Sequence, residues 1–180
     1  MKNKIDFNKI KWSKIDREKA DFFYNEAIAR LESIHKNNDS ITNKALSMLS
    51  FSVPVLTALI GYFILQWGAV SFQLRSVSVC SIVFLFAILI LLLFVLLPKG
   101  FSSAQGEPSS YFTDDYYLNS MLDILKGNIQ ALQQSIDEDM AVQKNRATLF
   151  RIAVVLFTVY PVVTVIVWVV TSFCIKQCWF

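Results

Sequence analysis

Few side chains in this 180-residue sequence could carry out chemistry. There is one histidine, His35, and there are three cysteines, Cys80, Cys174 and Cys178. His35 falls at the end of a predicted polar helix with no cysteine or paired carboxylate near it in sequence, so neither a metal site nor a catalytic triad is expected. No glycine-rich phosphate-binding loop occurs. The sequence predicts a protein that is not an enzyme and that binds no metal and no cofactor.

The cysteines add little. Cys80 lies inside an apolar run, where it would act as a small hydrophobic residue. Cys174 and Cys178 have the spacing CxxxC but lack the other ligands of a metal site. Packing at the lipid boundary and a disulfide, internal or between subunits, both remain open for this pair.

Three long apolar runs, at 45–70, 77–97 and 149–173, dominate the sequence. A bilayer core of about 30 Å needs roughly 20 residues of helix, so each run is long enough to span it. The runs are apolar on all sides rather than striped, which is typical of lipid-exposed helices. The expected fold is an all-α integral membrane protein with three transmembrane helices and cytoplasmic amphipathic helices.

Basic residues set the expected orientation. Residues 1–44 hold ten lysines and arginines, whereas the 71–76 connection contains only Arg75. This asymmetry places the N-terminus and the long second loop in the cytoplasm and the C-terminus outside. The chain then divides into a cytoplasmic leader and amphipathic helix (1–44), a transmembrane hairpin (45–97), a cytoplasmic loop with a heptad helix (98–147), and the third span with a short outer tail (148–180).

The cytoplasmic segments read as helices that need partners. Residues 13–36 have an amphipathic pattern, and the polar residues 37–40 predict a turn before the first span. Apolar residues further on recur at spacings of 4, 3, 4, 3 and 4, which predicts a coiled-coil seam for a second copy or a partner protein. The seam consists of Leu118, Leu122, Leu125, Ile129, Leu132 and Ile136. Without proline or glycine between Gly127 and Pro161, this helix is expected to continue into the third span.

Small and polar residues occupy one face of the first span: Ser47, Ser50, Pro54, Thr57 and Gly61. Such a face either packs closely on another helix or lines a wet path between several copies. Pro161 in the third span could act as a hinge, although proline is ordinary in membrane helices. No ionisable group falls near the middle of a span, which argues against an ion-coupled carrier.

The leader is basic and partly apolar. Its cations are Lys2, Lys4, Lys9, Lys11, Lys14, Arg17 and Lys19. This composition suits an anionic lipid surface, and it equally suits a leader that only enforces orientation. No nucleic acid is expected as a partner.

Two stretches resemble a known family. The sequence ADFFYNEAIARLESIHKNNDSITNKALSMLSFSVPVLTALIGYF, from Ala20 to Phe63, resembles the entry to small bacterial membrane effectors of the SLATT and Pycsar transmembrane type. In that pattern an Asn/Asp-Lys-Ala motif opens the first span, and Asn43-Lys44-Ala45 occupies this place here. The later stretch LDILKGNIQALQQSIDEDMAVQKNRATLFRIAVVLF looks like the helix that leads back to the membrane.

The resemblance implies antiphage defence at the bacterial inner membrane. In such systems a signal made during infection causes the effector to assemble and damage the membrane. This sequence departs from the commoner two-span plan by its third span, and it has no recognisable nucleotide-sensing domain, so the trigger stays open. The leading hypothesis is a non-enzymatic oligomeric effector that permeabilises or perturbs the membrane after a cytoplasmic trigger. The alternatives are a membrane-resident immunity or superinfection-exclusion protein and a scaffold subunit of a larger membrane complex.

Overall fold

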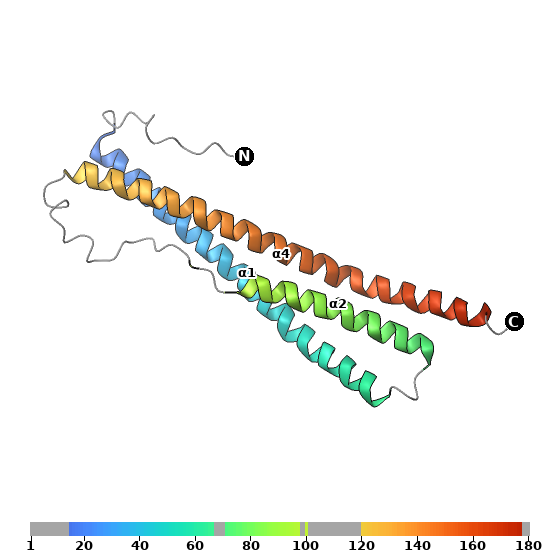
Figure 1. Cartoon of the computed structure of the whole chain (residues 1–180). Coiled ribbons are helices and arrows are strands. Elements are labelled where there is room, and N and C mark those ends of the chain that lie inside the picture. Colours follow the sequence, from blue (N-terminus) through green and yellow to red (C-terminus); the bar gives the residue numbers. More distant parts are fainter. Residues whose placement is uncertain (1–14, 67–70, 98–99, 101–119, 178–180) are drawn as a thin grey trace. The chain divides into compact units, whose positions relative to one another are not determined.

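The structure is a computed structural model that describes residues 15–66, 71–97, 100 and 120–177 (Figure 1). The described residues form three helices, α1 (Arg17–Leu65), α2 (Phe72–Leu96) and α4 (Met121–Gln177), and no strand. Each helix is long and apolar enough to cross a membrane. The sequence predicted both the all-helical class and the three candidate spans, which suggest a multi-pass membrane protein.

Helix α1 is 49 residues long and begins with a side-chain cap. The carboxylate of Asp16 accepts a hydrogen bond of 2.9 Å from the backbone N–H of Lys19, which would otherwise lack a partner in the first turn. The turn predicted at residues 37–40 is wrong, because α1 continues through them into the apolar segment. Asn38 is buried there, so burial overrides the preference of these polar residues for a turn.

Helix α2 is apolar on all sides, but it has a buried side. The buried residues recur at spacings of 3, 4, 3, 4 and 3, which is the pattern of a helix that packs along one seam. They are Ser78, Ser81, Leu85, Ile88, Leu92 and Val95. Large apolar side chains such as Val83, Phe86 and Leu93 are exposed on the other side. In a membrane this outer side would face lipid or another subunit.

Helix α4 is a single uninterrupted helix of 57 residues, so the predicted continuity between the heptad segment and the third apolar run is confirmed. Its first turn is capped by Ser120. The Ser120 hydroxyl donates to the carboxylate of Asp123 at 2.7 Å, and the backbone N–H of Asp123 donates back to that hydroxyl at 3.3 Å.

The chain forms two compact units, and α1 and α4 each contribute to both. Unit 1 contains residues 1–38 and 99–143. Its described part is a pair of helix segments that run in the same direction (Figure 1). Leu31 and Ile34 of α1 pack on Leu132 and Ile136 of α4, and half-buried apolar residues surround them.

Unit 2 contains residues 39–98 and 144–180 and holds the apolar parts of all three helices. Its core is formed by Ala45 of α1, by Ile88, Leu92 and Val95 of α2, and by Ala153 of α4. Aromatic pairs extend the packing. Phe51 lies edge-on to Phe157, with ring centroids 6.2 Å apart, and the rings of Phe84 and Tyr160 lie 6.4 Å apart.

Candidate functional site

Polar side chains buried between the helices are the groups best placed to have a specific role. Burying a polar group is unfavourable unless it finds a partner, so each one must have a structural or functional reason. The buried polar residues among those described are Asn38, Ser52, Ser78, Ser81, Asp139 and Arg146. The two charged residues each connect different helices within their unit.

In unit 1, Asp139 of α4 pairs with His35 of α1. Nε2 of His35 lies 3.0 Å from Oδ2 of Asp139, and the side chain of Asp139 is only 3% exposed. The imidazole donates this hydrogen bond when its proton is on Nε2, whether the ring is neutral or charged. The carboxylate beside His35 comes from a residue 104 positions away in sequence.

The acidic run 137–139 is not the uniformly solvated face that its sequence suggests. Asp139 is buried, whereas the carboxylates of Asp137 and Glu138 bond to the amides of Gln133 and Gln134 on their own helix, at 3.0 and 2.9 Å. Helical periodicity explains the difference, since three successive residues point in directions about 100° apart. Of these three residues, Asp139 is the one that faces α1.

In unit 2, Arg146 of α4 joins all three helices. Its Nε donates to the backbone carbonyl of Val95 in the last turn of α2, and one terminal nitrogen donates to the hydroxyl of Thr42 in α1, both at 2.9 Å. Carbonyls in the last turn of a helix have no partner within the helix and carry its negative partial charge, so a guanidinium is a favourable cap. Arg146 is only 5% exposed. It thus fixes the point where α2 ends between the two longer helices.

The burial of Asp139 and Arg146 was not predicted, although the spacing of the seam residues indicates it. The predicted seam ends at Ile136, and further steps of 3, 4 and 3 residues lead to Asp139 and then to Arg146. Both charged residues thus continue the seam. Within the described parts of the chain no group of three or more His, Cys, Asp or Glu side chains could hold a metal ion.

The predicted seam is occupied within one chain. Leu125, Ile129, Leu132 and Ile136 are buried, Leu122 is half-buried, and Leu118 lies outside the described residues. Leu132 and Ile136 contact α1, so α1 of the same chain supplies the partner that the sequence left unnamed.

The small and polar face of α1 is turned away from α2 and α4 within unit 2. Ser47, Ser50, Pro54 and Thr57 are exposed and Gly61 is half-buried, whereas Ala45, Ser52 and Leu56 form the buried side. The hydroxyls of Ser47 and Thr57 donate to the carbonyls one turn earlier on their own helix, both at 2.9 Å. Among the described residues of unit 2, this face is left largely uncovered by α2 and α4.

The remaining predicted residues form no site. Pro161 is exposed within α4. Arg17 and Lys19 are exposed, and Lys19 pairs with Asp16 at 3.0 Å, while Lys2, Lys4, Lys9, Lys11 and Lys14 lie outside the described residues. Cys80 is half-buried and Cys174 exposed, both as free thiols, and Cys178 is not among the described residues.

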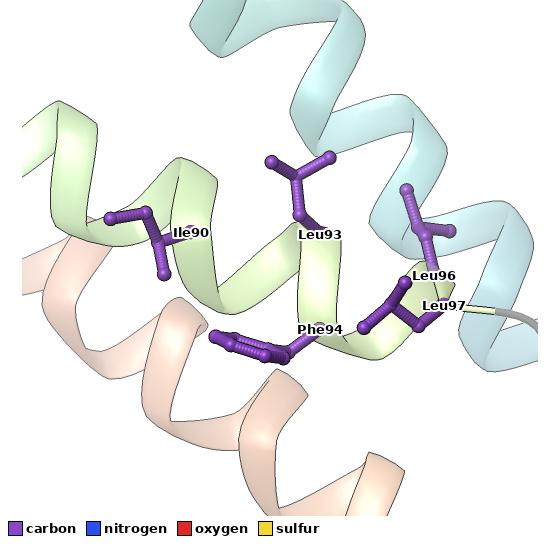
Figure 2. A pocket seen from close by; sticks show the side chains of 5 residues that line it. All are labelled: Ile90, Leu93, Phe94, Leu96 and Leu97. Carbon is purple, nitrogen blue, oxygen red and sulfur yellow. The ribbon is translucent and has the colours of Figure 1, made fainter.

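One apolar hollow of about 410 Å³ lies along the last two turns of α2 (Figure 2). It is lined by Ile90, Leu93, Phe94, Leu96 and Leu97. These side chains carry no polar atom that could orient a substrate.

Comparison with known proteins gives no relative: no family model, no curated protein and no solved structure matches this chain. The function has to be argued from the residues themselves.

Proposed function

We propose that this protein is a non-enzymatic effector of the bacterial inner membrane. After a trigger reaches its cytoplasmic helices, several copies assemble and permeabilise or perturb the bilayer, as in antiphage defence. The single observation that carries the proposal is the outward face of α1 in unit 2, where Ser47, Ser50, Pro54 and Thr57 are exposed on a candidate span.

The core of unit 2 consists of Ala45, Ile88, Leu92, Val95 and Ala153, all of them fully buried and apolar. Such a core excludes water where it is packed. A path for ions is therefore more readily formed between copies than through this core.

The outward face of α1 is the best candidate for that boundary. Small residues let helix backbones approach closely, and hydroxyls can line water once several helices surround an axis. Opposite this face, α1 packs on its own chain, so the same helix can hold unit 2 together while meeting a second copy.

The experiment follows membrane potential with a voltage-sensitive dye in bacteria that express the protein. We compare wild type with a Ser50→Leu, Thr57→Leu variant, which makes the outward face of α1 bulky and apolar. A Val79→Leu, Val83→Leu variant changes exposed residues of α2 and serves as the matched control. Depolarisation by wild type and by the control, but not by the α1 variant, supports the proposal. Equal depolarisation by all three forms contradicts the role of this face.

A second function is favoured by the hydrogen bonds of the same face. Because the Ser47 and Thr57 hydroxyls are bonded to their own helix, the face can lie against lipid without water. A protein of this kind is harmless alone and acts by blocking an incoming toxin or DNA-injection apparatus, as an immunity or superinfection-exclusion protein does. No depolarisation by wild type, together with protection in a phage or toxin challenge, would favour this function.

A further inference from the structure

We infer that the His35–Asp139 pair is a latch that holds α1 and α4 together in unit 1 of the resting protein, and that its release is the activating step. This inference rests on the proposed effector function. It adds to that function the place where a cytoplasmic trigger must act.

The latch depends on the burial of one carboxylate. The Asp139 side chain is 3% exposed, and its bond to His35 comes from the other helix. Taking a hydrogen-bond donor away from a buried carboxylate is costly. The closed helix pair is therefore coupled to the presence of His35 opposite Asp139.

The layers just before this pair along both helices are apolar and would not require it. Leu31 and Ile34 pack on Leu132 and Ile136, and Ile28 and Met140 flank them. Replacing a buried ionic or polar pair by apolar residues is often neutral or stabilising, whereas removing one member is costly. With a polar pair at this position, breaking one hydrogen bond is enough to destabilise the helix pair. A leucine layer has no such single bond to break.

The latch is reachable from solvent on one side. The His35 side chain is 33% exposed, while Asp139 is enclosed. Other ionisable groups on the adjoining turns point outward. Glu32 and Lys36 of α1 and Glu138 of α4 are exposed, and Asp137 is bonded to Gln133 of its own helix. A partner protein that binds the exposed edge of His35 can therefore break the hydrogen bond between His35 and Asp139. Separation of α1 and α4 would then let water reach the Asp139 carboxylate.

The test uses His35→Ala, which removes the hydrogen bond between α1 and the buried carboxylate, and a His35→Leu, Asp139→Leu variant, which turns the latch into an apolar layer. Glu138→Gln is the matched control, because Glu138 neighbours the latch but is exposed and bonds on its own helix. The first measurement is hydrogen–deuterium exchange of residues 24–38 and 128–143 in detergent-solubilised full-length protein. The second is the inducer level at which cells depolarise.

We expect His35→Ala to raise the exchange of both segments about tenfold or more and to depolarise cells at a several-fold lower inducer level than wild type. The double leucine variant should exchange no faster than wild type and should need a higher inducer level. If His35→Ala loosens the helices but depolarises no more readily than an active wild type, the latch is overturned while the proposed function stands. The latch is also overturned if exchange is unchanged in His35→Ala. If no form depolarises cells at any level, although His35→Ala opens the helix pair, both the latch and the proposed function fail.

Discussion

Replacing Thr42 by valine should destabilise unit 2 through Arg146. The substitution keeps the shape of the side chain but removes the hydroxyl that accepts a 2.9 Å hydrogen bond from the guanidinium. Because Arg146 is only 5% exposed, water cannot easily replace the hydroxyl. The substitution therefore leaves one N–H donor of the guanidinium without this acceptor. Hydrogen bonds to charged groups contribute about 1.5–3 kcal/mol. For a chain of this size each kcal/mol shifts the unfolding temperature by about 2–4 °C, so we expect a decrease of roughly 3–12 °C.

The assay is thermal unfolding of the purified protein in detergent, followed by tryptophan fluorescence, as a double-mutant cycle with Arg146→Met. Methionine keeps much of the arginine stem but donates no hydrogen bond to Thr42 or to the carbonyl of Val95. In the Arg146→Met background, Thr42→Val should have a clearly smaller effect, because the hydrogen bond between Thr42 and the guanidinium is already gone. A Thr148→Val variant is the control, since the Thr148 hydroxyl is exposed and bonds to the Lys144 carbonyl of its own helix. If Thr42→Val lowers the unfolding temperature equally in both backgrounds, the reasoning about Arg146 is refuted.

Three further predictions concern unit 1. Ile136→Ala removes a side chain that is 1% exposed and should cost about 2–5 kcal/mol in the free energy of unfolding, measured by the same thermal assay. Gly127→Ala should stabilise α4 by about 0.5–1 kcal/mol, because Gly127 lies within the helix and an added Cβ meets nothing within 4 Å; a lower unfolding temperature would contradict this. The pKa of Asp16 should lie below 3.8 in an NMR titration, because the backbone N–H and then the side chain of Lys19 bond to its carboxylate. Since folding lowers this pKa, the stabilising effect of the cap is fully present above about pH 4 and is lost as the pH falls through the lowered pKa. An unshifted Asp16 pKa would argue against the cap.

The helices could be predicted because their signals are local. The three apolar runs exceed the length of a bilayer crossing, and each of them lies largely within α1, α2 or α4. The absence of proline and glycine between Gly127 and Pro161 was enough to predict one continuous α4. Such patterns depend on neighbours within a few turns, so a single sequence is sufficient to read them.

The pairing of the helices could not be predicted in the same way. The seam through Leu132 and Ile136 indicated that a partner was needed, but an apolar stripe accepts α1 of the same chain as readily as another copy. The contact between His35 and Asp139 joins residues 104 positions apart, and nothing near either residue in sequence indicates the other. The turn predicted at 37–40 failed for the same reason, because the burial of Asn38 depends on residues that are distant in sequence. Asn38 is buried and remains helical.

The buried polar pairs also restrict how the helices can move. In unit 1 the paired residues His35 and Asp139 are 104 positions apart, and in unit 2 Thr42 and Arg146 have the same separation. Apolar layers alone would tolerate a shift of one heptad, since one leucine or isoleucine layer resembles the next. With the polar pairs in place, a shift of α4 by seven residues toward the start of α1 would bring Asp139 to the level of Ile28, which cannot donate a hydrogen bond. A gradual slide of α4 along α1 is therefore disfavoured, because it would separate buried polar groups before new partners are in reach.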